Sequence, residues 1–131
     1  MKNIDYCIGS FENGNVHTLL ETVSNTISNW NPHPKFRGVY LKHMVTGSQT
    51  QNKFSCHIVK IEAGCMLDVH IHEGITELHE IMNGSGICII NGINVAYKPG
   101  DYAIIPNDTN HQVIAGENGL VLFAKFFPSL L

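Results

Sequence analysis

The sequence predicts an all-β fold, either an antiparallel sandwich or a barrel, with a short helical segment at the N-terminus. From Val39 onward, short stretches rich in Val, Ile, Phe and Tyr recur about every 8–12 residues, and residues typical of turns separate them. No helical pattern lies between these stretches, which favours antiparallel strands. The length of 131 residues suits one domain with a hydrophobic core.

The N-terminal segment carries the one helical pattern. Its apolar residues are spaced three and four apart, and Asn15 is available as an N-cap. These apolar residues are Val16, Leu19, Leu20, Val23 and Ile27. The next stretch, "NWNPHPKFRG", predicts an extended connector because two prolines stand among Asn, His and Gly. We therefore expect residues 1–38 to form a helical and extended segment that packs on a barrel formed by residues 39–131.

Nine apolar stretches predict the strands of this barrel: "VYLKHMV", "FSCHIVKI", "LDVHIH", "ELHEIM", "GICIING", "INVAYK", "YAIIP", "HQVIAG" and "LVLFAKFF". The connectors between them, including "NGSG" and "GENG", predict turns. Asn91-Gly92 lies between two apolar runs and is typical of a type I′ hairpin. Because the last stretch is strongly apolar, we expect it to be buried within the barrel or at a subunit contact.

Charge and composition narrow the classes of function. With a net charge of −3 and its Lys and Arg residues scattered singly, the chain lacks the basic patch that binding to nucleic acid or an anionic membrane requires. The N-terminus lacks a signal-peptide pattern and no apolar run approaches about 18 residues, so we expect a cytoplasmic protein. The cysteines Cys7, Cys56, Cys65 and Cys88 form no C-x-x-C pair, and we expect them to be buried small hydrophobic residues.

Charged and ionisable residues gather in one stretch, "GCMLDVHIHEGITELHEIMNG", residues 64–84. If "DVHIH" is a strand, His70 and His72 lie on the same face. Two imidazoles this close are poor neighbours when charged and good neighbours when they share a metal ion. After a turn at "EGIT", the returning strand places Glu77, His79 and Ile81 on one face. Glu77 is nearest the turn and can meet the two histidines.

One histidine, His111, lies downstream of this stretch. It follows a predicted strand and a turn initiated by Pro106, so it begins a strand that can lie opposite His70 and His72 in a closed barrel. An H-x-H pair alone is a weak signal, because a histidine is more often a surface or core residue than a ligand. We interpret His57 as a structural residue and not a ligand. It lies two and four residues before Val59 and Ile61, so all three side chains can face inward on one strand.

The spacing of glycines and ligand types resembles the first motif of the cupin superfamily. Five, one, four and six residues separate Gly64, His70, His72, Glu77 and Gly84 in turn. The second cupin motif is matched by Gly100, Pro106, Asp108 and His111. Asp108 stands where the family usually has Gly, and Ala115 where it often has Asn. Because Asp tolerates the left-handed conformation better than most residues, we expect the turn to be kept.

The chain thus resembles a small single-domain cupin over about residues 39–127. The resemblance implies a jelly-roll antiparallel β-barrel that holds one divalent metal ion through His70, His72, Glu77 and His111. Three imidazoles and one carboxylate suit Fe(II), Mn(II), Ni(II) or Co(II), or Zn(II) with fewer ligands. Our first hypothesis is a metal-dependent enzyme acting on a small organic substrate by Lewis-acid or oxygen-dependent chemistry. The alternative is a non-catalytic sensor or small-ligand-binding protein.

Two further expectations follow. His79 shares the inward face with Glu77, so it is either a catalytic residue for proton transfer or a hydrogen-bonded core histidine. Because single-barrel cupins usually dimerise, the resemblance also implies a homodimer that forms through the N-terminal segment or the last strand.

Overall fold

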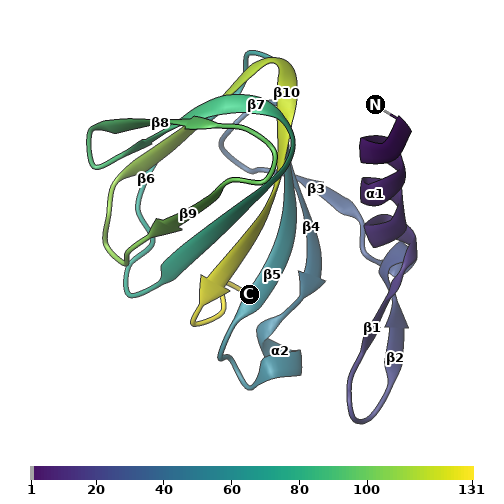
Figure 1. Ribbon diagram of the computed structural model, residues 1–131. Coiled ribbons are helices and arrows are strands. Elements are labelled where there is room, and N and C mark those ends of the chain that lie inside the picture. The colour runs from purple at the N-terminus through teal and green to yellow at the C-terminus, as the bar shows by residue number, and fades with distance from the viewer. Residues whose placement is uncertain (1) are drawn as a thin grey trace.

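Two long strands, β7 (Thr76–Ile90) and β10 (His111–Phe127), organise the barrel in the computed structural model (Figure 1). The structure describes the backbone of residues 2–131 and the side chains from Ile8 onward. One half of β10 pairs with β6 (Met66–His70), and the other half pairs with β5 (Ser55–Ile61). β7 pairs with β10 along its length, with β8 (Ile93–Tyr97) at one end and β9 (Tyr102–Ile105) at the other. All these pairings are antiparallel, as predicted.

The two long strands join the two layers of the barrel because each of them bends. The predicted turns at "NGSG" and "GENG" are therefore wrong: both segments lie inside continuous strands. The register between β7 and β10 shifts between Ala115 and Leu120, where Gly84 (φ +83°) and Gly119 (φ +75°) adopt the left-handed conformation. A Cβ on Gly84 would overlap the backbone of Gly119. Glycines in these positions form bulges that bend paired strands instead of reversing the chain.

The outer edge of the sheet continues from β5 through β4 (Val39–Val45) to β3 (Trp30–Pro32). β4, β5, β6, β8 and β9 lie where the sequence predicts strands. β3 falls within the predicted extended connector and pairs with β4. A short helix, α2 (Gly47–Thr50), replaces part of the connector that follows β4.

The N-terminal helix exists, but its predicted position is wrong. The helix is α1 (Lys2–Asn13), while the predicted stretch forms β1 (Asn15–His17), β2 (Thr22–Ser24) and the 3-10 helix η1 (Asn25–Ile27). The Thr18 hydroxyl accepts the backbone N–H groups of Leu20 and Glu21 and closes a tight turn. Local bonds of this kind compete with helix formation, and β-branched residues favour strands. Leu19 and Leu20 therefore lie fully exposed at the hairpin tip rather than on an apolar helix face.

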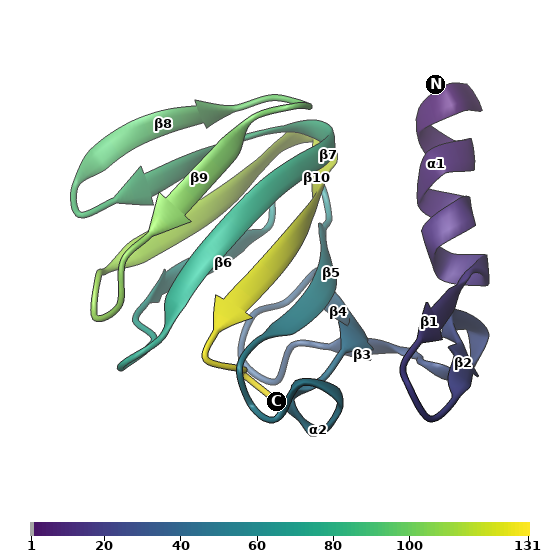
Figure 2. The same cartoon turned by 60° about the horizontal axis from the view of Figure 1, so that its bottom comes forward.

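The N-terminal elements lie outside the barrel, on the side away from β8 and β9 (Figure 2). Phe11 of α1 makes an edge-to-face contact with Phe123 on the outer face of β10, with 4.9 Å between ring centroids. Within the described part of the chain, no helix is both long and apolar enough to cross a membrane.

The predictions for two turns and for the last apolar stretch are confirmed. Asn91 (φ 48°) and Gly92 (φ 82°) both have positive φ between the paired strands β7 and β8, which confirms the type I′ hairpin. Asp108 also adopts the left-handed conformation (φ 60°), as expected for the residue replacing Gly in the second motif. The stretch "LVLFAKFF" lies inside the barrel sheet, since β10 is paired on both sides by β5 and β7.

The core combines an apolar cluster with several buried polar side chains. The largest apolar residues in it include Ile58, Ile61, Ile105, Leu120 and Leu122, each at most 1% exposed. Cys88 is buried as expected, whereas Cys56 and Cys65 are half-buried, and the side chain of Cys7 lies outside the described ones. The buried polar residues are Asn25, Lys42, Ser55, His57, Glu77, His79 and His111.

His57 confirms the structural interpretation made from its strand parity. It is fully buried, with Nδ1 at 2.8 Å from His43 Nδ1 and Nε2 at 2.8 Å from the Ser55 hydroxyl oxygen. Burial first, and then the neighbouring His43, lowers the pKa of His57 from 6.5 to about 4.

His57 should therefore link stability to pH. Because the unfolded chain binds the proton more readily, its contribution is complete above pH 6.5 and is lost as the pH falls toward 4. We expect this loss to be about 3 kcal/mol in the metal-free protein. Urea unfolding at pH 7 and pH 4 measures it in the wild type and in His57→Gln, which cannot take up the proton. The variant should lose about 3 kcal/mol less between the two pH values, and equal losses would contradict the assignment.

Candidate metal centre

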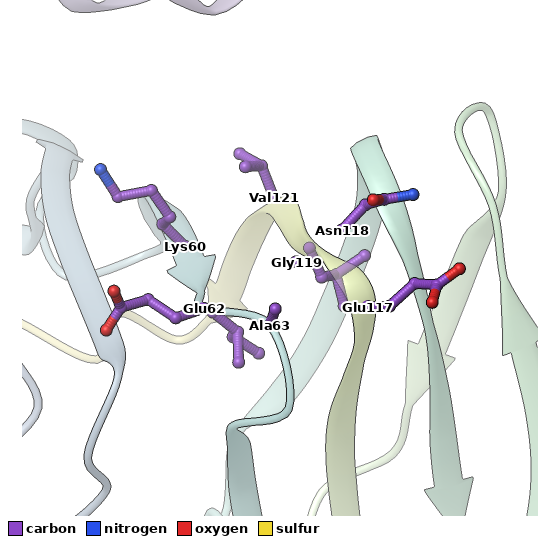
Figure 3. Close-up of a pocket in the computed structure, with 9 residues that line it drawn as sticks. Lys60, Glu62, Ala63, Glu117, Asn118, Gly119 and Val121 are labelled. Atoms are coloured by element: carbon purple, nitrogen blue, oxygen red, sulfur yellow. The ribbon is translucent and has the colours of Figure 1, made fainter.

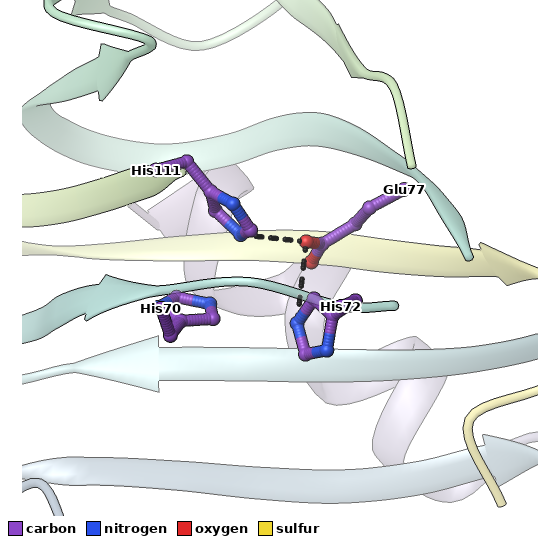
Figure 4. Close-up of side chains that lie close together, drawn as sticks. All are labelled: His70, His72, Glu77 and His111. Atoms are coloured by element: carbon purple, nitrogen blue, oxygen red, sulfur yellow. Dashed lines mark ion pairs between the residues drawn. The ribbon is translucent and has the colours of Figure 1, made fainter. Parts of the chain in front are cut away.

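The four predicted ligands come together at one point in the barrel. One donor atom from each of His70, His72, Glu77 and His111 lies within 4.8 Å of the others (Figure 4). His70 is the last residue of β6 and His111 begins β10, whereas His72, predicted within the same strand as His70, lies two residues beyond its end. The expectation that the strand of His111 lies opposite the histidine pair is wrong, because His111 pairs directly with His70 in the neighbouring strand. His70 and His111 therefore meet through adjacent strands, whereas Glu77 pairs with Phe126 at the other end of β10.

Backbone carbonyls fix the orientation of two of the imidazoles. The Nδ1–H of His70 donates to the Asp68 carbonyl oxygen at 2.6 Å, and that of His111 donates to the Thr109 carbonyl oxygen at 3.0 Å. A carbonyl oxygen only accepts hydrogen bonds, so Nδ1 carries the proton in both rings. Nε2 is then left with a lone pair, which is the arrangement found in metal-ligating histidines.

One close contact in the cluster calls for a cation. His111 Nε2 lies 3.0 Å from Glu77 Oε1, and both atoms are buried without a hydrogen-bond partner. Two lone pairs facing each other in an apolar interior are costly unless positive charge lies between or beside them. His72 Nε2 is 3.7 Å from the same carboxylate oxygen. A proton could satisfy one contact, whereas a metal ion would satisfy all of these donors together.

The charge states at neutral pH suit metal binding. Burial, the largest cause, lowers the pKa of His70 to about 4 and also lowers the pKa of His72. Burial raises the pKa of the Glu77 carboxyl, but the charge of the neighbouring His79 and its hydrogen bond act against burial, and that pKa lies well below its ordinary value. Neutral imidazoles and an ionised carboxylate are the forms that bind metals.

His79 is buried and contacts the Glu77 oxygen that does not face the other histidines. It is 1% exposed, its Nε2 donates to Glu77 Oε2 at 2.8 Å, and its Nδ1 lies 2.8 Å from the Tyr97 hydroxyl. One Glu77 oxygen is thereby held by His79, and the other is directed at the histidines. Burial lowers the pKa of His79, but the Glu77 carboxylate raises it more, to about 9. The inward faces of Glu77, His79 and Ile81 are confirmed, and the catalytic role of His79 stays a prediction.

Tyr97 belongs to the site but was missed from the sequence. It is 2% exposed and lies on β8, opposite Gly86 of β7. Its position at the end of the strand that follows the Asn91-Gly92 hairpin was the available signal, since every second residue of that strand faces inward. Burial raises the pKa of the Tyr97 hydroxyl, which therefore stays protonated.

Other parts of the described structure offer weaker candidates. A cavity of about 350 Å³ lies between β5 and the bend of β10, lined by residues 60–63 and 117–121. Figure 3 shows that Lys60 and Glu62 extend to one side of it and Glu117 to the other, so the three charged groups do not converge on one point. Among the described residues, the cluster around Glu77 is the single group of three or more His, Cys, Asp or Glu residues placed to hold a metal ion.

Comparison with known proteins agrees with this fold. The Cupin_2 family model, described as a cupin domain, matches residues 57–124. A predicted oxalate decarboxylase from Thermotoga maritima has a similar structure, with a TM-score of 0.70 and 24% identity over 77% of this chain and 91% of that chain. KdgF from Halomonas sp. gives a TM-score of 0.69 and 22% identity over 79% and 89% of the two chains. Identities this low show a shared fold and leave activity open. No curated protein matches the chain.

The titration of His79 tests the arrangement around Glu77. In the metal-free wild type, we expect NMR to report a His79 pKa of about 9, because the Glu77 carboxylate stabilises the imidazolium. In Glu77→Gln, burial acts without that carboxylate, so the pKa should fall below the ordinary 6.5. Glu80→Gln is the matched control, since Glu80 pairs with Lys125 on the other face of β7. A His79 pKa that is the same in Glu77→Gln as in the wild type would contradict this arrangement.

Proposed function

The chain belongs to the Cupin_2 family of cupin domains, and on this premise we propose that it is a metal-dependent enzyme acting on a small organic substrate. His70, His72, Glu77 and His111 would hold one divalent ion. The observation that carries the proposal is the buried, unpartnered pair of His111 Nε2 and Glu77 Oε1, 3.0 Å apart. Such a pair is costly without a cation and favourable with one.

The chemistry of the donor set supports a transition metal. Three imidazole nitrogens and one carboxylate oxygen favour Fe(II), Mn(II), Ni(II), Co(II) or Zn(II) over the oxygen-loving Mg²⁺ and Ca²⁺. When bound, such an ion supplies a Lewis acid or, if it is iron, a site for oxygen-dependent chemistry. Four protein ligands leave positions of an octahedral ion free for the oxygens of a substrate.

The exposure of the ligands indicates where a substrate would enter. The side chain of His72 is 22% exposed, compared with 6% for Glu77 and 1% for His111. The cluster is therefore open on the side of His72 and closed by the barrel on the side of Glu77 and His111. A small molecule would bind at the open side, and the barrel wall would keep bulk water away from the closed side.

We assign His79 a positioning role toward Glu77 as part of this proposal. Its hydrogen bond to Oε2 holds the carboxylate with Oε1 directed at the histidines, and Tyr97 fixes the ring in turn. Such supporting hydrogen bonds orient metal ligands and typically change metal affinity 10–100-fold. A direct role in proton transfer, which the sequence also suggested, requires His79 to act through Glu77, because both of its ring nitrogens are engaged.

Metal content tests the site directly. We expect untagged protein, purified without added metal, to contain about one equivalent of a transition metal by elemental analysis, because four donors converge on one point. His70→Ala/His111→Ala should contain almost none and should fail to bind added Co(II). A wild type that holds no metal and binds no added divalent ion would overturn the proposal and leave a metal-free ligand-binding barrel.

The role of His79 is tested by metal affinity. His79→Ala should weaken Co(II) binding about 10–100-fold, measured by competition with a chelator of known affinity, because Glu77 loses the bond that orients it. His79→Gln, whose amide can still donate to Glu77, should recover part of the affinity. Wild-type affinity in His79→Ala would rule out the positioning role. If turnover per bound metal is also unchanged once a substrate is found, His79 has no part in the chemistry.

The non-catalytic alternative makes a different prediction with the same protein. A sensor or carrier would bind metal and a small ligand reversibly without altering the ligand. Mass spectrometry of a metabolite mixture incubated with the metal-loaded wild type and with His70→Ala/His111→Ala separates the cases: an enzyme changes a component only in the wild type. The homodimer also stays a prediction; both edges of the β10 strand are already paired within the chain.

A further inference from the structure

A loop at residues 33–38, here called the mouth loop, lies beside the open side of the candidate metal centre. Its ends are fixed by backbone hydrogen bonds from His33 N–H to the Val39 carbonyl and from Glu62 N–H to the Gly38 carbonyl, each 2.8 Å long. Gly38 has φ +77°, and a Cβ on it would overlap the Cys65 sulfur. Only glycine fits this close approach, so the loop has a defined path rather than a variable one.

Within the loop, hydrogen bonds fix the tautomer of His33. Its Nδ1 accepts the backbone N–H groups of Lys35 at 3.1 Å and Phe36 at 3.3 Å. A nitrogen that accepts two N–H groups carries no proton, so the ring is neutral and its proton is on Nε2. No hydrogen bond in the described part of the chain uses this Nε2–H. His33 thus presents one oriented donor without a partner in the protein.

Aromatic contacts connect this ring, through Phe36, to one of the predicted ligands. The Phe36 ring stacks on His33, with centroids 4.6 Å apart and an interplanar angle of 22°. Its other neighbour is His70, at 6.1 Å between centroids. His33 is also near enough to His72 to influence that residue electrostatically. His33 therefore lies near the ligand pair, in which the His72 side chain is 22% exposed.

The charge of the proposed site selects a ligand class. A divalent ion with three neutral imidazoles and one carboxylate leaves a net charge of about +1 in a largely buried place. An anionic oxygen ligand neutralises this charge, and its outer oxygens need hydrogen-bond donors. A carboxylate meets both conditions, since one oxygen can bind the metal while another accepts a hydrogen bond.

We propose that His33 is a substrate-binding residue whose Nε2–H donates to an outer oxygen of a carboxylate substrate at the metal, with Phe36 holding the ring in place. This inference rests on the proposed metal site. It adds a substrate class and a residue outside both sequence motifs.

Two substitutions separate substrate binding from loop structure. His33→Ala removes both the free donor and the acceptor that holds the loop. His33→Asn is the matched control, because an Asn side-chain oxygen can accept the same backbone N–H groups in an Asx turn but has no donor that reaches as far. The probe is malonate, which chelates a metal through one oxygen of each carboxylate and leaves two outer oxygens. It is titrated into Co(II)-loaded protein and followed by the visible absorption bands of the cobalt ion.

Each outcome decides one of the claims. We expect both variants to bind Co(II) as the wild type does and to bind malonate about tenfold more weakly, which corresponds to one hydrogen bond to a charged group. If His33→Asn binds malonate as the wild type does, His33 only caps the loop and the inference is overturned. Wild-type protein that binds Co(II) but not malonate would exclude the carboxylate class. A wild type that does not bind Co(II) would instead overturn the metal site itself.

Discussion

A buried carboxylate that faces bare imidazole nitrogens must be balanced by positive charge, and the polar interior of this barrel is arranged around that requirement. Glu77 is 4% exposed, and its two oxygens have different surroundings. Oε2 receives a hydrogen bond from His79, whereas Oε1 faces His111 and His72 without one. The backbone carbonyls that hold the Nδ1 protons of His70 and His111 prevent these rings from turning a donor toward Glu77. His70, His111 and Glu77 thus each direct a lone pair at one point, where a cation has the most favourable energy.

The bends in β7 and β10 make this convergence possible. His111 and Glu77 are the first and second residues of two strands that pair along their whole length, yet their side chains meet because the starts of these strands lie in different layers. Phe126, near the end of β10, pairs with Glu77 and also contacts the His72 ring, with 5.1 Å between centroids. The site therefore lies between the two layers and depends on both halves of each long strand.

The alternation of side chains along strands correctly predicted which site residues share a face. The positions of glycines did not correctly predict how the strands are connected. Parity alone placed His70 with His72, and Glu77 with His79, because alternation is a local property of an extended backbone. The motif glycine Gly84, and Gly119 outside the motifs, misled the turn prediction, since a bulge and a hairpin have similar local sequences and differ in which strand pairs beyond them. The N-terminal helix was misplaced for a related reason: apolar spacing in residues 16–27 fits a helix, but Thr18 hydrogen bonds form a hairpin. Strand alternation in β8 carried a signal for Tyr97, whereas His33 reaches the site through tertiary contacts that no local pattern records.

The approach of Gly84 to Gly119 has a consequence for how this sequence can change. The two residues are distant in the chain, and a side chain on Gly84 would occupy the space of the Gly119 backbone. A replacement at this position cannot be compensated by a smaller side chain opposite, because none is smaller than that of glycine. Position 84 therefore accepts only glycine as long as the two strands keep this contact.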